Sequence, residues 1–234
     1  MIGVFSADLG NQGDYTALSY VEMVEIYDEP KVDDIERMVR EVTYEYKLKY
    51  LKRVDLGQSY PEIVREIKDK LDNPKIRGCD LVVDGTGVGL PVLQEMTESG
   101  LKPIGICITG GHNVGDWKDP RGRKIGKTVP KRDIVQVLQS AFKSRRLHIP
   151  RSIDYCKELI DELVNFKVKI SSNGTDTYEA WRESIHDDLV LSIGMAVWYL
   201  RYRYGLTKKV INENMDLLVK KDEDYDPFND LYDR

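Results

Sequence analysis

Acidic residues stand at the ends of three apolar segments that lie far apart in the sequence. Asp8 and Asp84 each end an apolar run with the length of a strand, whereas Asp187 and Asp188 open Leu189–Leu200, which is too long for a typical strand and predicts a helix. An α/β sheet could bring these three ends to one point. Carboxylates gathered in this way repel one another and need a cation, and hard oxygen ligands favour Mg²⁺ or Mn²⁺.

The pattern therefore predicts a metal-dependent enzyme that cleaves phosphodiester bonds. Asp8, Asp84, Asp187 and Asp188 are its candidate catalytic residues and metal ligands. Each also has a purely structural explanation, since Asp before glycine commonly forms a turn and carboxylates cap helix starts. Considered as a set, the four residues favour the metal-dependent function. All of them lie at the ends of the most buried-looking segments, where an unpaired charge is costly.

The predicted elements describe a mixed sheet flanked by helices. The predicted strands are residues 2–8, 15–27, 41–54, 81–83 and 103–108. The predicted helices are residues 59–71, 89–99, 131–145, 153–165 and one that begins at about 187, with a hairpin turn at 171–174 between strands 166–170 and 175–179. Three amphipathic strands followed by two short, wholly apolar ones predict an antiparallel three-strand meander joined to parallel strands in an α/β fold.

The chain of 234 residues fits one large domain. We expect that domain over residues 1–211, with 110–129 as a basic, hairpin-like insertion and 212–234 as an acidic, loosely ordered tail. The three cysteines lack disulfide or zinc spacing, which indicates a reducing compartment. No signal peptide and no apolar stretch of membrane-spanning length is visible, so we expect a cytoplasmic protein without a membrane partner.

Basic residues are concentrated in one part of an otherwise acidic chain. The formal net charge of −5 argues against simple nucleic-acid binding, yet residues 116–146 contain ten Lys or Arg against three Asp. This segment suits local contact with a polyanion, although a solvated loop and helix face would look the same. Lys127, Lys131 and Arg132 are the candidate phosphate contacts.

Two glycine-rich motifs give no support for nucleotide binding. Gly85, Gly87 and Gly89 do not have the G-x-G-x-x-G spacing of dinucleotide-binding proteins. Residues 122–128 approach a P-loop, but they have one residue too few between the glycines and are followed by Pro130. No ATPase motor is therefore predicted within the chain.

The ordered set of motifs resembles the nuclease domain of the large terminase subunit of tailed bacteriophages. The motifs are Ser6-Ala7-Asp8-Leu9-Gly10, Gly13-Asp14-Tyr15-Thr16, Val82-Val83-Asp84-Gly85-Thr86-Gly87-Val88-Gly89, Val129-Pro130-Lys131-Arg132-Asp133-Ile134, Leu147-His148-Ile149-Pro150 and His186-Asp187-Asp188-Leu189-Val190. The resemblance covers most of the chain, from Ser6 to about Trp198. The resemblance implies a ribonuclease H-like fold, two divalent metal ions, and endonucleolytic cleavage of double-stranded DNA during viral genome packaging.

The resemblance also implies roles and partners. Asp8 would bridge both metal ions, Asp84 would hold one, and Asp188, alone or with Asp187, would hold the other. The implied partners are double-stranded DNA, an ATPase motor domain, a portal and a small terminase subunit, in the host cytoplasm if the protein is viral. The ATPase domain that the family places before this region is not in the sequence, so translocation is not predicted.

Three alternatives remain open at the level of the sequence. A RuvC-like Holliday junction resolvase would prefer four-way junctions to linear duplex. A phosphotransferase related to sugar kinases and actin would bind nucleotide without cleaving DNA. A DNA-binding or assembly module would keep its function when Asp8 and Asp84 are replaced by Asn.

Overall fold

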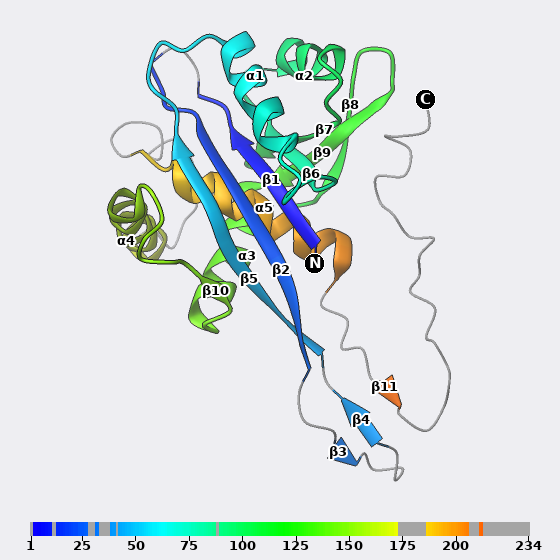
Figure 1. Ribbon diagram of the computed structural model, residues 1–234, viewed down its shortest axis with the longest axis vertical. Helices are drawn as coiled ribbons and strands as arrows, with labels where there is room; N and C mark the ends of the chain where they lie inside the picture. The colour runs from blue at the N-terminus through cyan, green and yellow to red at the C-terminus, as the bar shows by residue number, and fades with distance from the viewer. Residues whose placement is uncertain are drawn as a thin grey trace.

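The computed structural model describes most of the chain as far as residue 205. The described residues are 2–10, 13–27, 31–32, 38–40, 42–87, 89–172, 186–205 and 211–212. Eight strands form one mixed sheet, and helices pack on both of its faces (Figure 1). This arrangement confirms the α/β architecture predicted from the sequence.

The first part of the sheet is the predicted antiparallel meander. Strand β1 (Ile2–Asp8) pairs with β2 (Ala17–Tyr27), and β2 pairs with β5 (Val42–Arg53). The first half of β5 alternates between buried and partly exposed side chains, as a strand with one face in a core must. The three strands lie side by side and form the longest part of the sheet (Figure 1).

The second part of the sheet is parallel. Strand β6 (Asp80–Asp84) lies next to β1, and β7 (Pro103–Thr109) lies next to β6. Helix α2 (Gly89–Glu98) connects the two strands, as a parallel crossover requires. Both strands have buried apolar residues without alternation, because helices cover both faces of the sheet at this point.

Segment 110–129, which was predicted as a hairpin-like insertion, extends the central sheet. Strand β8 (Gly115–Lys118) and strand β9 (Lys124–Pro130) pair in antiparallel register, and β9 also pairs in parallel with β7. A short strand, β10 (Leu147–His148), pairs with β5 at the opposite edge. The strand order is therefore β10-β5-β2-β1-β6-β7-β9-β8, so the hairpin lies at one edge of the central sheet.

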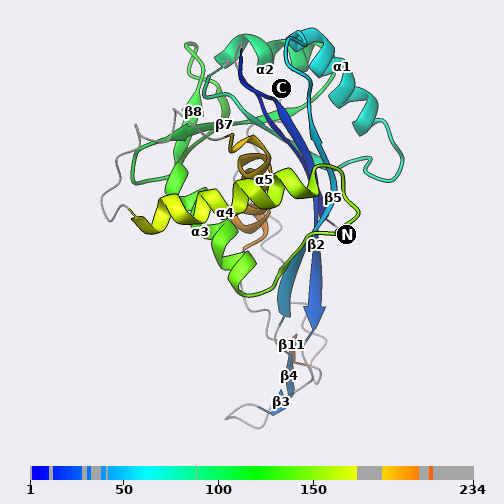
Figure 2. The same cartoon turned by 90° about the vertical axis from the view of Figure 1, so that its left-hand side faces the viewer.

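Two cores lie on opposite faces of the sheet. Helix α1 (Tyr60–Leu71) and helix α2 pack on one face, and helix α3 (Lys131–Lys143) and helix α5 (Asp188–Tyr204) pack on the other (Figure 2). Residues Leu189–Leu200 of α5 are all buried, as expected for a helix that is hydrophobic on every side. Within the described residues, no helix has the length and apolar character needed to cross a membrane.

The prediction of strand 166–170 is wrong, because helix α4 (Cys156–Ser172) continues through it. Alternation over five residues is too short to exclude a helix, and no Gly or Pro stops the helix before Ser172. The first two residues of the predicted turn, Ser171 and Ser172, are also helical, whereas residues 173–179 of that hairpin and residues 213–234 of the predicted tail lie outside the described residues. A small separate sheet joins β3 (Lys31–Val32), β4 (Met38–Arg40) and β11 (Ile211–Asn212).

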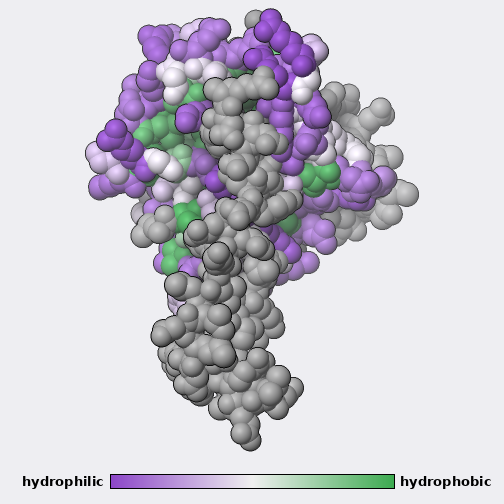
Figure 3. Space-filling view, turned by 90° about the vertical axis from the view of Figure 1, so that its right-hand side faces the viewer, coloured by the Kyte–Doolittle hydropathy of each residue, from purple (hydrophilic) through white to green (hydrophobic). Residues whose placement is uncertain are grey.

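The face seen in Figure 3 is mainly hydrophilic where it is described. Its hydrophobic residues appear in small groups that are separated by polar side chains. Such scattered apolar residues are ordinary on a protein surface and do not indicate a docking site. The position of the site is therefore better sought at the ends of the strands.

Gly126 allows β9 to approach β7 closely, and β9 leads directly into α3. A Cβ atom at Gly126 would lie 1.8 Å from the carbonyl oxygen of Gly105, which is backbone and cannot rotate away. We expect Gly126→Ala to lower the free energy of unfolding by about 2 kcal/mol or more. Urea denaturation measures this change. Gly111→Ala, whose Cβ would have an ordinary 3.4 Å contact, is the control and should leave stability nearly unchanged.

Candidate functional site

Asp8 and Asp84 lie side by side at the ends of neighbouring strands. Asp8 is the last residue of β1 and Asp84 is the last residue of β6. These strands are parallel with Ala7 opposite Val83, so the next residue of each strand leaves the sheet at the same place. Both side chains are buried, with exposures of 7% and 9%, and the nearby charge of Asp84 raises the pKa of Asp8.

A buried serine sets the position of α5 over β1. Ser192 Oγ is hydrogen-bonded to the carbonyl oxygen of Ser6 at 3.2 Å and to Ser19 Oγ at 2.8 Å. Asp188 precedes Ser192 by four residues, about 6 Å along a helix. Asp8 follows Ser6 by two residues, about 7 Å along a strand. These two distances are similar. The hydrogen bonds of Ser192 therefore place Asp188, at the start of α5, beside Asp8, at the end of β1.

The electrostatics of the cluster agree with this placement. Burial raises the pKa of Asp8 well above its usual value, and the charges of Asp84, Asp188 and Asp187 raise it further. Burial likewise raises the pKa of Asp188 to about 6. The structure thus places Asp84, Asp187 and Asp188 near Asp8, in surroundings that oppose the ionisation of Asp8, Asp84 and Asp188.

Thr86 orients the carboxylate of Asp84. The backbone N–H of Thr86 donates to Asp84 Oδ1 at 2.8 Å, and the hydroxyl of Thr86 donates to the same oxygen. The hydroxyl oxygen in turn accepts a hydrogen bond from the backbone N–H of Ile108 at 2.7 Å. These bonds partly offset the effect of burial, which raises the pKa of Asp84. One oxygen of Asp84 is therefore fixed by the protein.

Asp187 and Asp188 have different surroundings. Asp187 accepts a hydrogen bond from Lys131 Nζ at 3.0 Å, and Lys131 is the first residue of α3. The buried Oδ2 of Asp188 has no hydrogen-bond partner among the described residues. Two nitrogen atoms of basic side chains lie near it without bonding it, Nδ1 of His186 at 3.9 Å and Nη2 of Arg53 at 4.0 Å. Of the two carboxylates, Asp188 has the oxygen that still needs a partner.

Two residues of this region were not singled out in the sequence. Glu162 of α4 is 5% exposed, and its carboxylate accepts hydrogen bonds from the guanidinium of Arg53 and from the backbone N–H of Val190. Burial raises the pKa of Glu162 to about 8, although both partners lower it. Neither residue belongs to a motif, and a Glu on a helix normally indicates a solvent-exposed position, so the sequence holds no signal for either.

The three predicted phosphate contacts differ in their accessibility. Lys127 is 7% exposed, and its ammonium donates to Asp116 within the β8–β9 hairpin at 2.7 Å. Lys131 contacts Asp187, as described above. Arg132 has a side chain that is 41% exposed and donates to the carbonyl oxygen of His112 at 2.8 Å. Of the three, Arg132 is the most accessible to a phosphate group.

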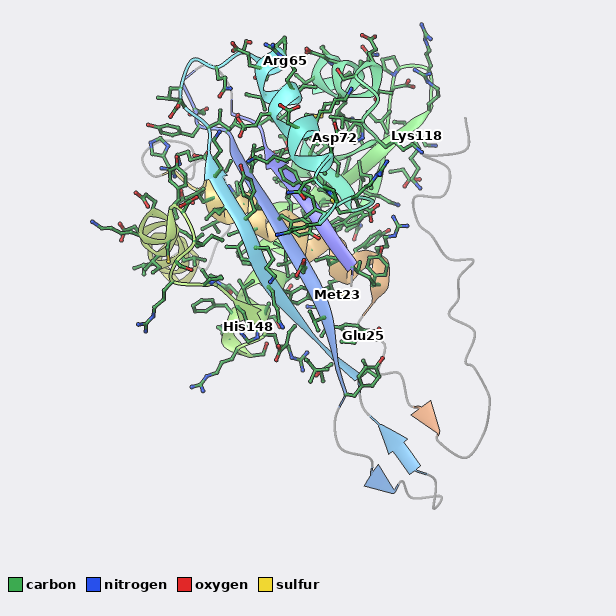
Figure 4. The ribbon with its side chains drawn as sticks, viewed as in Figure 1. Met23, Glu25, Arg65, Asp72, Lys118 and His148 are labelled. Carbon is green, nitrogen blue, oxygen red and sulfur yellow. The ribbon has the colours of Figure 1, made fainter. Side chains whose placement is uncertain are left out.

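The basic segment 116–146 does not form one continuous strip. Lys118 lies on the hairpin, whereas His148, close in sequence to the end of α3, lies on the opposite side of the molecule (Figure 4). Helix α3 separates Lys131 and Arg132 at its start from Lys143 at its end. A polyanion at the acidic site would therefore meet the start of α3 and not its end.

The acidic residues fit a divalent metal by their chemistry. They supply buried carboxylate oxygens, including the unpartnered Oδ2 of Asp188, and hard oxygen ligands suit Mg²⁺ and Mn²⁺. Within the described residues, no three His, Cys, Asp or Glu side chains are already arranged around a common metal position. In the structure Asp187 is engaged by Lys131, and the raised pKa of Asp8 means that a metal ion would compete with protons at that carboxyl.

Comparison with known proteins gives a likeness in structure. No family model and no curated protein sequence matches the chain. The large terminase nuclease of the thermophilic phage G20c is similar over 83% of this chain and 80% of its own, with a TM-score of 0.51 and 17% identity. The manganese-soaked terminase nuclease domain of human cytomegalovirus covers 84% and 82%, with 14% identity, but its TM-score of 0.44 adds no support.

The likeness to the phage nuclease establishes the fold. At 17% identity it does not by itself transfer an activity or a set of site residues. The mixed eight-stranded sheet with helices on both faces matches that nuclease across most of both chains. The chain therefore has the ribonuclease H-like fold of a terminase large-subunit nuclease.

Proposed function

We propose that this protein is a metal-dependent endonuclease that cleaves double-stranded DNA. The observation that carries the proposal is the gathering of buried carboxylates at the joined ends of β1, β6 and α5. Such a cluster is costly without a counter-charge, and ligands bind at the carboxyl ends of strands in open α/β sheets. The fold shared with the phage terminase nuclease supports the same reaction class by analogy.

We assign the metal ligands from the surroundings of each carboxylate. Asp8 lies between Asp84 and the start of α5, so it is the candidate to bridge two Mg²⁺ or Mn²⁺ ions. Asp84 would hold one ion through the oxygen that Thr86 leaves open. Asp188 would be the primary ligand of the other, because Asp187 is already bound to Lys131.

Two bound ions would supply an activated water for attack on the scissile phosphorus and would stabilise the departing 3′ oxygen. The protein's own contribution is positional. Thr86 holds Asp84, Lys131 holds Asp187, and the start of α5 presents Asp188 to Asp8. Arg132 at the exposed start of α3 is the candidate contact for the DNA backbone.

We further propose a setting in viral genome packaging, on the strength of the shared fold alone. An ATPase motor domain, a portal and a small terminase subunit would then be the partners, in the cytoplasm of the host. The nuclease would act within that assembly on the duplex that the motor moves.

Plasmid digestion tests the function directly. With Mn²⁺ or Mg²⁺ the protein should nick or linearise supercoiled DNA, and EDTA should abolish cleavage. Asp8→Asn should lower the rate by about 100-fold or more, since a ligand change exceeds the 10–100-fold cost of changes around the ligands. Asp188→Asn should cost more than Asp187→Asn. Unaltered cleavage by Asp8→Asn, with far-UV circular dichroism intact, would reject the assignment.

The dependence of stability on pH provides a second test. A carboxyl whose pKa is raised in the folded state binds its proton more tightly there than in the unfolded chain. The metal-free protein should therefore lose stability as pH rises from about 4 through the pKa values of Asp188, near 6, and Glu162, near 8. Over the same range Mn²⁺ should stabilise increasingly, because protons no longer compete with it.

Urea denaturation at pH 5 and pH 8 measures this effect. Mn²⁺ at one fixed concentration, a hundred times its dissociation constant at pH 8, should add about 2.7 kcal/mol at pH 8 and much less at pH 5. The Asp8→Asn/Asp84→Asn variant should lose most of the response to Mn²⁺. An equal effect of Mn²⁺ at both pH values would show that the clustered carboxylates do not bind it.

The contact with DNA can be tested at the two ends of α3. Arg132→Ala should weaken binding to duplex DNA and reduce the slope of log K against log salt by about one, because one phosphate contact is lost. Lys143→Ala, an exposed position at the far end of the same helix, is the matched control. Fluorescence anisotropy over a range of salt concentrations measures both. Equal slopes in the two variants would place the DNA elsewhere.

A further inference from the structure

We infer that Glu162 is a positioning residue, which caps helix α5 from helix α4 and so leaves Asp187 and Asp188 available to the acidic site. This inference rests on the proposed function, because it concerns the residues that would hold the metal. It adds Glu162 and Arg53 to the site, although neither is proposed as a metal ligand.

The start of α5 lacks the cap that its own sequence offers. The first backbone N–H groups of a helix have no partner within the helix, and an Asp at the N-cap position usually accepts one of them. Asp187 occupies the N-cap of α5, yet its side chain makes no capping hydrogen bond. Its carboxylate is turned to Lys131 instead.

Glu162 takes the place of the missing cap. Its Oε2 accepts a hydrogen bond from the backbone N–H of Val190, the third residue of α5, at 3.0 Å. This N–H is one that an N-cap side chain would normally bind. The hydrogen bond is buried and joins residues 28 positions apart. Helix α4 thus supplies the capping acceptor that Asp187 does not provide.

Arg53 links this cap to the acidic site. Its guanidinium bonds Oε1 of Glu162, and its Nη2 lies 4.0 Å from Oδ2 of Asp188. The guanidinium also lies over the ring of Tyr15, with its Cζ 4.8 Å from the ring centroid. Glu162 and Tyr15 therefore hold the guanidinium of Arg53 in place near Asp188. Its positive charge attracts the carboxylate of Asp188.

The arrangement explains why Glu162 is buried without being a ligand. Both of its oxygens already accept hydrogen bonds, one from Arg53 and one from Val190. If Glu162 were removed, the free N–H groups of α5 would compete with Lys131 for the carboxylate of Asp187. The first turn of α5 would loosen, and Asp188 would lose its fixed direction toward Asp8.

The test compares Glu162→Ala and Glu162→Gln with Glu158→Gln, an exposed position one turn earlier on α4. Calorimetric titration with Mn²⁺ alone measures the affinity for metal without DNA. Glu162→Ala should weaken that affinity by about 10–100-fold, the usual cost of removing a group that orients a ligand. Glu162→Gln keeps the size and one acceptor oxygen, so its loss should be smaller, and Glu158→Gln should match the unmodified protein.

Hydrogen exchange followed by mass spectrometry provides a readout that needs neither metal nor activity. Amides in the first turn of α5 should exchange faster in Glu162→Ala than in Glu158→Gln. In DNA cleavage, Glu162→Ala should lower kcat at saturating DNA and leave KM for DNA nearly unchanged, because no DNA contact is removed. If Glu162→Ala does not fold, the same three measurements on Glu162→Gln decide the question.

The outcomes separate this inference from the proposed function. Mn²⁺ affinity within twofold of the unmodified protein in the Glu162 variants, or unchanged exchange in the first turn of α5, would overturn the positioning role. If the unmodified protein binds no Mn²⁺ and cuts no DNA, the proposed function fails, while the exchange measurement still decides whether Glu162 caps α5.

Discussion

Mutual repulsion between buried carboxylates is the constraint on which the rest of the site depends. Asp8, Asp84 and Asp188 would separate if they were free to move, since burial and neighbouring negative charge both disfavour ionisation. Rigid packing holds them together. The start of α5 is fixed next to β1, because twelve consecutive residues of the helix are buried and Ser192 is hydrogen-bonded to β1 and β2.

Two basic side chains next to the acidic cluster already form contacts with its carboxylates or with Glu162. Lys131 bonds Asp187, and Arg53 is shared between Glu162 and Asp188. The pKa values of Asp8 and Asp84 are both raised, so that protonation of this pair reduces their repulsion. Because a raised pKa favours the protonated carboxyl, a divalent cation would compete with protons at this site, and the proposed metal binding would become stronger as pH rises.

Much of the fold, and the acidic residues themselves, could be predicted from the sequence. Asp8 and Asp84 were visible because a parallel sheet brings strand ends together, and Asp188 was visible because a long apolar helix follows it. The sequence predicts a hairpin over residues 110–129 but does not show that β9 joins the central sheet, since the Gly and Lys residues of β9 obscure its alternation. Its position depends on the close approach of Gly126 to Gly105, which no local pattern records.

The residues that orient the carboxylates could not be predicted, for a different reason. Arg53 and Glu162 are 109 residues apart, and each looks like an ordinary surface charge in its own segment. Their roles arise only when α4, α5 and β5 meet. Fine positioning of this kind depends on tertiary contacts, whereas the acidic residues themselves are marked by local chemistry.

The orientation of individual oxygens gives the site its chemical asymmetry. Thr86 fixes one oxygen of Asp84, and Lys131 engages Asp187, while Oδ2 of Asp188 has no hydrogen-bond partner among the described residues. Because Glu162 caps α5, Asp187 does not need to accept a hydrogen bond from the start of its own helix. The carboxylates of Asp187 and Asp188 can then both face the acidic cluster. A helix that capped itself with Asp187 would present one carboxylate fewer. The acidic site thus depends on a helix, α4, that contributes no ligand to it.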